Sequence, residues 1–111
     1  MEFKWTYTKD SLPEKFSDVY AIVKTEDGFE TDVFGKRIPV KPRIMRFEKD
    51  VKHRIDWSSE YETYDAAFWD EDNPKCYNDS PHFSTGKYLP VDEVEKWVYV
   101  EDVMNFLLNM K

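Results

Sequence analysis

The sequence predicts an α+β fold, in which a mainly antiparallel sheet of about five strands carries an amphipathic C-terminal helix packed on it. Apolar and polar residues alternate in short segments over most of the chain, which is typical of strands. From Val100 onward the apolar residues recur every three or four positions, which is typical of a helix. The 111 residues contain neither a repeat nor a linker, so we expect one domain, 1–111.

Turn signals and apolar patterns divide the chain into the expected strands and loops. Val19–Thr25 is apolar on both faces, which predicts a central strand of the sheet. Asp27-Gly28 comes next and predicts a tight hairpin turn, with Phe29–Phe34 as the returning strand. Asp70–Gly86 is rich in turn residues and predicts a long loop. Further strands are expected at Arg43–Glu48, Glu62–Trp69 and Val94–Val100.

The C-terminal segment has the pattern of an amphipathic helix. Its apolar stripe consists of Val100, Val103, Met104, Leu107, Leu108 and Met110. Glu101 and Asp102 lie in the first turn, where the helix dipole favours anions, and Lys111 lies at the end, where it favours cations. A helix with one apolar side is expected to lie on a sheet and bury that side.

The composition predicts a protein of a reducing cytoplasm. Cys76 is the only cysteine, whereas small secreted domains usually depend on several disulfides. The segment 1–10 has no apolar run, so we expect no secretory leader. The longest apolar stretches are far shorter than the roughly 20 residues of a membrane span, so we expect no membrane partner.

No motif for catalysis or for metal binding is found. The soft metal ligands His53, Cys76 and His82 lack the paired spacing of zinc sites. The acidic run 70–73 lacks the glycine and the final glutamate of a calcium loop. Three glycines are too few for a phosphate-binding loop, and the nucleophile motifs of hydrolases are absent. We therefore expect no catalytic residue, no metal and no cofactor, and a protein that is not an enzyme.

Charge is distributed unevenly along a chain whose net charge is -7. Positions 36–54 hold eight basic residues and two acidic ones, whereas positions 60–72 hold six acidic residues and no basic one. The acidic residues expected to form a partner-binding face are Glu60, Glu62, Asp65, Asp70, Glu71 and Asp72. The residues that would bind an anion in the alternative interpretation are Arg43, Arg46, Lys49 and Lys52.

Three interpretations of this distribution stay open. An acidic face would mimic nucleic acid toward a protein with a basic groove. Alternatively, the basic segment 36–54 would bind a small anionic ligand or nucleic acid, although the net negative charge opposes the latter. In the third interpretation the basic strand lies beside the acidic strand, and their charges cancel within the monomer.

Aromatic residues make up 17% of the chain. Those near the expected loops are Trp57, Tyr61, Tyr64, Trp69, Tyr77 and Phe83. Exposed rings would suit stacking on a sugar or a base. The core is the favoured place for them, because a small chain has little else of that size to bury.

Several short motifs resemble a family of small uncharacterised domains carried by bacteriophages and prophages. They are Trp5, Ser11-Leu12-Pro13-Glu14, the strand Val19–Val23, Ala66-Ala67-Phe68-Trp69 and Val94-Glu95-Lys96-Trp97. The family usually follows its last tryptophan with Met-Pro-Leu-Pro and stops, whereas this chain continues as Val98-Tyr99-Val100-Glu101 into a helix. The basic segment also has the character of an insertion. The resemblance implies a phage or integrated element in a bacterial cytoplasm and no particular activity.

Together these observations predict a non-enzymatic accessory protein of a phage or mobile element that binds a protein partner. Its narrowest form is a counter-defence inhibitor, whose acidic face blocks the basic nucleic-acid-binding groove of a host protein. The alternative is a small-ligand or nucleic-acid binding module that uses segment 36–54 and the loop aromatics.

Overall fold

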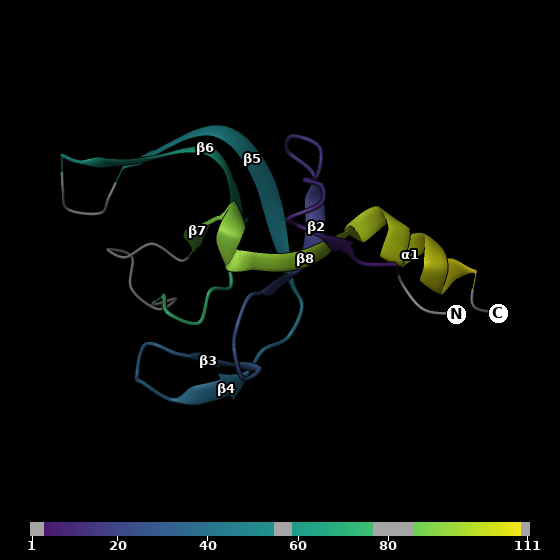
Figure 1. Ribbon diagram of the computed structural model, residues 1–111, viewed down its shortest axis with the longest axis horizontal. Helices are drawn as coiled ribbons and strands as arrows, with labels where there is room; N and C mark the ends of the chain where they lie inside the picture. The colour runs from purple at the N-terminus through teal and green to yellow at the C-terminus, as the bar shows by residue number, and fades with distance from the viewer. Residues whose placement is uncertain (1–3, 55–58, 77–85, 110–111) are drawn as a thin grey trace.

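Six strands form one antiparallel sheet in the computed structural model, which describes residues 4–54, 59–76 and 86–109 (Figure 1). The strand order is β1-β8-β2-β5-β6-β7, and β3 and β4 form a separate two-stranded sheet. The elements are β1 (Thr6–Tyr7), β2 (Asp18–Val23), β3 (Phe29–Thr31), β4 (Arg37–Pro39), β5 (Arg43–Arg54), β6 (Tyr61–Asp70), β7 (Lys87–Pro90), the 3-10 turn η1 (Val91–Glu93), β8 (Val94–Tyr99) and α1 (Val100–Leu108). The α+β prediction is confirmed, with more strands than expected.

The strand β2 occupies the middle of the sheet, as its apolar residues predict. It pairs with β5 along one edge and with β8 along the other, and Tyr20 faces Ile44 and Val98 in the two registers. Val19 and Ala21, on its other face, are completely buried. An apolar strand is stable in this position because both of its edges are hydrogen-bonded and neither face is left fully in water.

The hairpin predicted at Asp27-Gly28 is wrong. Both edges of β2 are already occupied by β5 and β8, so the chain after Gly28 cannot pair back onto it. β3 pairs instead with β4, around a turn in which Gly35 has a φ of 80°. In that turn a side-chain oxygen of Asp32 accepts hydrogen bonds from the backbone N–H groups of residues 34 and 36, each across 2.9 Å.

The long hairpin of β5 and β6 extends further than the sequence predicts. Residues 49–54, which lie beyond the end of the expected strand Arg43–Glu48, continue β5 and pair with β6 up to Arg54 opposite Tyr61. Backbone pairing with a neighbouring strand is enough to keep them extended, although few of their side chains are buried. The short strand β7 was not predicted, because it lies next to the turn-rich segment that ends at Gly86.

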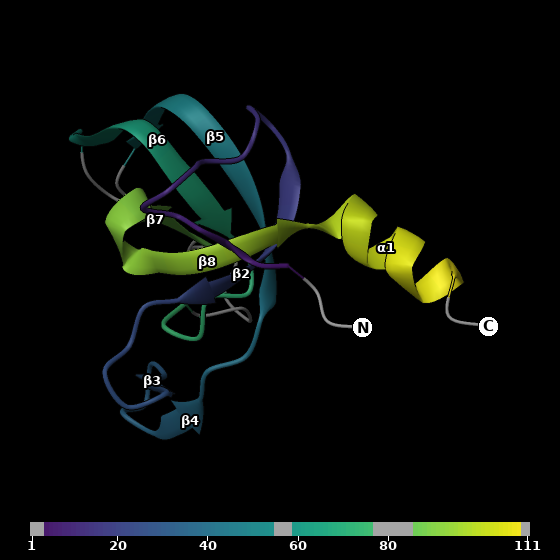
Figure 2. The same cartoon turned by 45° about the vertical axis from the view of Figure 1, so that its right-hand side comes forward.

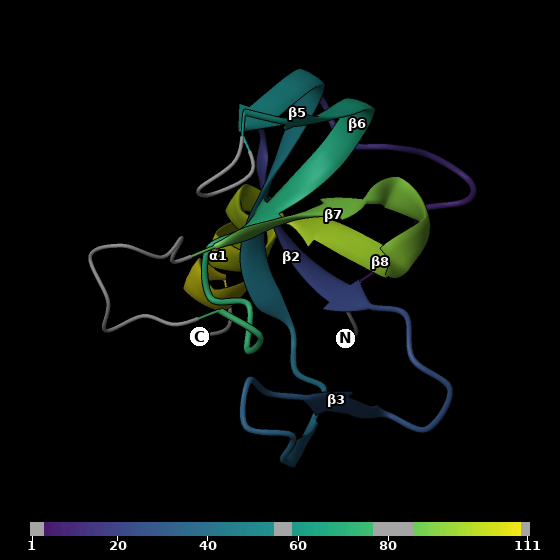
Figure 3. The same cartoon turned by 90° about the vertical axis from the view of Figure 1, so that its left-hand side faces the viewer.

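The sheet curls strongly, and one of its faces encloses the core (Figure 3). The buried cluster consists of Val19, Ala21, Met45, Phe47, Phe68, Leu89, Val94 and Trp97. The rings of Phe47 and Phe68 meet edge to face, with their centroids 5.2 Å apart. Trp97 also donates a hydrogen bond of 3.0 Å from Nε1 to the backbone oxygen of Ser11, which ties the N-terminal segment to β8.

The amphipathic helix is present, but it does not lie on the sheet. α1 follows β8 directly and projects away from the strands, as Figures 1 and 2 show. None of its residues is buried. The physical reason is that the curled sheet covers its own core with Leu89, Val94 and Trp97, so no open core face remains for a helix.

Candidate functional site

The basic and acidic segments lie next to each other in the sheet. β5 carries five of the eight basic residues of segment 36–54 and pairs with β6, which carries three of the six acidic candidates. His53 stands opposite Glu62, and Lys52 stands opposite Thr63. Adjacent strands bring opposite charges within reach of each other. Across this hairpin the charges of Arg43 and Asp70 cancel within the monomer, whereas Lys49 and Lys52 stand opposite uncharged residues.

A buried ion-pair cluster lies at the start of β5. Nε of Arg43 donates to both carboxylate oxygens of Asp70 at 3.2 and 3.1 Å, and a terminal nitrogen donates to Oδ2 at 2.7 Å. The other terminal nitrogen donates to Glu30 across 2.5 Å, and Nδ2 of Asn73 donates to Asp70 across 3.1 Å. The Asp70 side chain is 0% exposed, and those of Arg43 and Glu30 are 14% and 11% exposed.

Two residues that the sequence predicts at exposed binding sites are largely buried in this cluster. The sequence places Asp70 on a partner-binding face and Arg43 on an anion-binding one, but in the structure they neutralise each other. Burial lowers the pKa of Arg43, and its hydrogen bonds with Asp70 and Glu30 raise it by more, so this pKa lies above its ordinary value. Arg43 therefore stays charged near neutral pH and needs both carboxylates as partners.

The other anion-binding candidates divide into two kinds. Arg46 pairs with Asp18 on β2 at 3.5 Å, with both side chains more than half exposed. Lys49 and Lys52 are exposed and form no ion pair with another described residue. The ammonium group of Lys52 lies 4.6 Å from the ring centroid of Tyr61. Of the four anion-binding candidates, Lys49 and Lys52 thus remain available to bind an anion.

The remaining acidic candidates do not share one face. Glu62 and Asp65 are an odd number of positions apart on β6, so the alternation of a strand directs them to opposite faces. Glu60 is exposed just before β6, and Glu71 and Asp72 are exposed in the turn after it. At about 3.3 Å per residue, roughly 30 Å of strand separates the two ends. The accessible acidic residues therefore form small separate groups.

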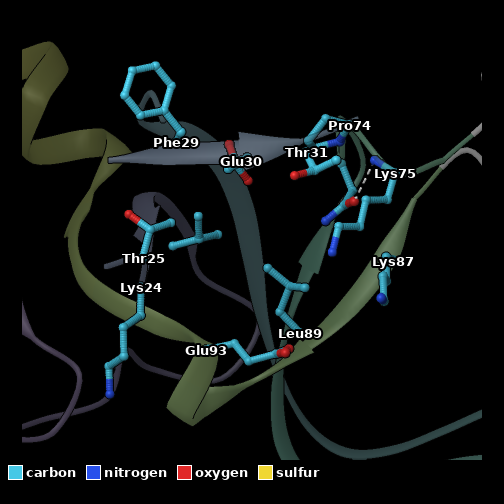
Figure 4. A pocket seen from close by; sticks show the side chains of 12 residues that line it. Lys24, Thr25, Phe29, Glu30, Thr31, Pro74, Lys75, Lys87, Leu89 and Glu93 are labelled. Carbon is cyan, nitrogen blue, oxygen red and sulfur yellow. Dashed lines mark hydrogen bonds between the residues drawn. The ribbon is translucent and has the colours of Figure 1, made fainter. Parts of the chain in front are cut away.

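A polar pocket lies beside the buried cluster (Figure 4). It has a volume of about 270 Å³ and is bordered by the end of β2, by β3, and by the segments on either side of the β6–β7 connection. Its charged lining residues are Lys24, Lys75, Lys87, Glu30 and Glu93. The ammonium group of Lys24 points away from the pocket in Figure 4, and Glu30 is engaged by Arg43.

The lining residues of this pocket indicate neither a particular reaction nor a ligand of one particular charge. Lys75 and Lys87 border it together with Glu93, so cationic and anionic groups are mixed. No histidine or cysteine is among its described lining residues. The described lining thus contains neither an imidazole nor a thiol that could serve as a nucleophile or as an acid–base group.

A second group of side chains combines His53 with three aromatic rings. The ring centroids of Trp69 and Tyr88 are 4.7 Å apart, and that of His53 lies 5.1 Å from Tyr88. Tyr64 lies 6.4 Å from Tyr88, whose hydroxyl donates to Oε1 of Glu48 across 3.1 Å. Burial raises the pKa of Tyr88, and the Glu48 carboxylate raises it further. These half-buried rings hold β7 against the β5–β6 hairpin.

The aromatics that the sequence places near loops have different environments. Tyr64 and Trp69 belong to the ring group just described, which supports a packing role for them. Tyr61 is 51% exposed. Trp57, Tyr77 and Phe83 lie outside the described residues.

Neither a metal-binding cluster nor a membrane-spanning helix is present in the described part of the chain. Within residues 4–54, 59–76 and 86–109, no three His, Cys, Asp or Glu side chains are close enough together to hold a metal ion. Cys76 lies in the turn after β6 and His53 in β5, while His82 lies outside the described residues. No helix in the described chain is long and apolar enough to cross a membrane.

The exposed side of α1 is the feature that the sequence did not lead us to expect. Six of the nine helix residues are apolar, yet Met104, Leu107 and Leu108 are 51%, 56% and 67% exposed. Of the apolar helix residues after Val100, only Val103 and Phe106 are half-buried. The periodicity that predicts the helix says that it has an apolar side, but not what covers that side.

The sheet continues this apolar region beside the base of the helix. Val98, Tyr20 and Ile44 lie in one row across β8, β2 and β5, and Ile44 is 49% exposed. A hollow of about 220 Å³ is lined by Trp5, Tyr20, Pro42, Val98 and Val103. We call this hollow, Ile44 and the three exposed residues of α1 the outer apolar surface. Comparison with protein-family models, with curated proteins and with solved structures finds no match to this chain.

Proposed function

We propose that this chain is a non-enzymatic accessory protein that acts by binding another protein. The phage or mobile-element setting comes from the family resemblance. The observation that carries the proposal is the outer apolar surface, in which the exposed apolar side of α1 adjoins the hollow on the sheet through Val103. Monomeric soluble proteins rarely expose large contiguous apolar patches, and such patches mark interaction sites.

The length of the helix strengthens the proposal. Helices shorter than about 12 residues are marginal in water without tertiary packing, and α1 has nine residues, none of them buried. A partner that covered Leu107 and Leu108 would supply that packing. Complete burial of a leucine contributes about 1.5–3 kcal/mol, so covering the exposed parts of both, 56% and 67%, would contribute roughly 2–4 kcal/mol.

A capture experiment with paired variants tests the proposal. The tagged chain is incubated with a lysate of its host cell, and retained proteins are compared for wild type, Leu107→Lys and Asn105→Lys. Both substitutions add one lysine to exposed positions of the same helix, on its apolar and polar sides. A protein retained by wild type and Asn105→Lys, but lost with Leu107→Lys, is expected. Identical capture by all three would contradict a role for the apolar side.

The acidic residues support a narrower version, in which the partner carries a basic nucleic-acid-binding groove. Glu71 and Asp72 are exposed, and the chain has a net charge of -7. Reversal of these two to lysine should weaken such a complex, as should added salt. Asp70 must be left unchanged in this test because it is buried against Arg43. Unchanged affinity would remove the narrower version and leave the broader one intact.

The alternative, an anion-binding module, now depends on Lys49 and Lys52. Titration with labelled oligonucleotides at low salt tests it under the conditions that favour phosphate contacts most. We expect no saturable binding, because Arg43 and Arg46 are engaged by carboxylates. Binding that is lost on Lys49→Gln and Lys52→Gln would favour the alternative instead.

A further inference from the structure

We infer that the outer apolar surface is covered by a second copy of this chain. The inference rests on the proposed function, because it names the protein that covers the same surface before a different partner displaces it. A two-fold interface between identical chains requires a patch that is complementary to itself. The shape and the charge of this surface both meet that requirement.

The shape combines a ridge and a hollow on one side of the molecule. Leu107 lies one helical turn beyond Val103, on the same face of α1, and Val103 lines the hollow with Tyr20 and Val98. The ridge therefore continues directly into the hollow. An apolar cavity of about 150 Å³ accepts a benzene molecule, so this hollow of about 220 Å³ has room for a leucine or methionine side chain. A two-fold rotation can bring the ridge of each copy to the hollow of the other.

Charged residues of opposite sign lie near the base of α1, basic ones beside the hollow and acidic ones in the first turn of the helix. Beside the hollow, Lys4 and Lys41 are exposed next to Trp5 and Pro42 in the chain, and the ammonium group of Lys96 lies 5.5 Å from the Trp5 ring centroid. On the helix, Glu101 and Asp102 are exposed in the first turn. Within the described chain none of these five forms an ion pair.

This division of charge favours a second copy over an unrelated partner. A partner of uniform charge would be attracted by one half of the surface and repelled by the other. A second copy supplies the same division, and a two-fold rotation can reverse its order, so that acidic and basic borders meet. Apolar contact and local attraction together would then overcome the repulsion expected between two chains of net charge -7.

The mass of the purified chain in solution tests the inference. Sedimentation velocity over roughly a hundredfold range of concentration should show a species of twice the 13.4 kDa monomer mass, growing with concentration. Helix content measured by circular dichroism should rise in parallel, because the dimer supplies packing that α1 lacks alone. A single monomeric species over the whole range would overturn the inference.

Variants locate the contact. Leu107→Lys on the helix and Ile44→Lys on the sheet should each weaken dimerisation about tenfold or more, whereas Asn105→Lys should leave it within about twofold. Leu107 and Ile44 are 56% and 49% exposed, so a lysine at either site is compatible with the monomer fold. A dimer that persists unchanged in both lysine variants would overturn the inference.

The charged borders have their own test. Lys4→Glu combined with Lys41→Glu should weaken the dimer, and Lys36→Glu, in the β3–β4 turn away from α1 (Figure 1), should not. If the two border substitutions changed nothing, the charge argument for a second copy would fail. Failure of dimerisation remains distinguishable from failure of the proposed function. A monomer that still captures a lysate protein in a Leu107-dependent manner overturns only this inference, and a chain that neither dimerises nor captures such a protein overturns both.

Discussion

Replacing Arg43 should destabilise this protein more than any exposed charge does. Arg43→Met removes the only cation that contacts Asp70 and Glu30 in the described cluster, whose side chains are 0% and 11% exposed. Removing one partner of a buried ion pair costs about 3–5 kcal/mol, because the remaining charge is buried without compensation. At about 4 °C per kcal/mol for a domain of this size, the melting temperature should fall by roughly 12–20 °C.

Urea unfolding followed by tryptophan fluorescence measures this loss. The matched control is Arg37→Met, because Arg37 pairs with Asp27 while both side chains are more than half exposed. Exposed pairs contribute at most about 1 kcal/mol, so the control should stay close to wild type. Removal of all three charges, by adding Asp70→Asn and Glu30→Gln to Arg43→Met, should recover part of the loss. Equal destabilisation by Arg43→Met and Arg37→Met would refute the argument that burial makes this cluster important.

Three further predictions concern Gly86, Gly28 and Tyr88. Gly86→Ala would place a Cβ atom 2.5 Å from Cζ2 of Trp69 and 2.9 Å from the nearest backbone carbon, so unfolding measurements should show a loss of about 1–3 kcal/mol. Gly28→Asn, at a φ of 81° with open space around it, should cost less than about 1 kcal/mol in the same measurements, because asparagine tolerates a positive φ better than most residues do. The pKa of Tyr88 is raised, so the native state holds its proton longer than the unfolded state does, and stability should fall as the pH rises above about 10. In Tyr88→Phe that alkaline loss should be smaller by urea unfolding at several pH values, and an unchanged pH dependence would contradict a role for Tyr88.

The candidate site was only partly predictable, and the acidic residues show why. Asp70 and Asp65 look alike in the sequence, since both belong to an acid-rich stretch without bases. The structure buries Asp70 against Arg43, 27 positions away, and leaves Asp65 exposed. Which carboxylate is neutralised depends on which long basic side chain of the neighbouring strand can reach it. That side chain is set by the register between β5 and β6, which single-strand patterns do not specify.

The sequence by itself determined the local elements. The apolar run of β2, the alternation of β6 and β8 and the helical period of α1 each appear where they were expected, because these patterns reflect the geometry of one segment. Only the tertiary structure decided the partners of those elements. β5 and β8 occupy both edges of β2 and exclude the expected hairpin, and the curl of the sheet closes the core and leaves α1 uncovered. Such competition for edges and faces is settled by segments far apart in the chain, and no local pattern records it.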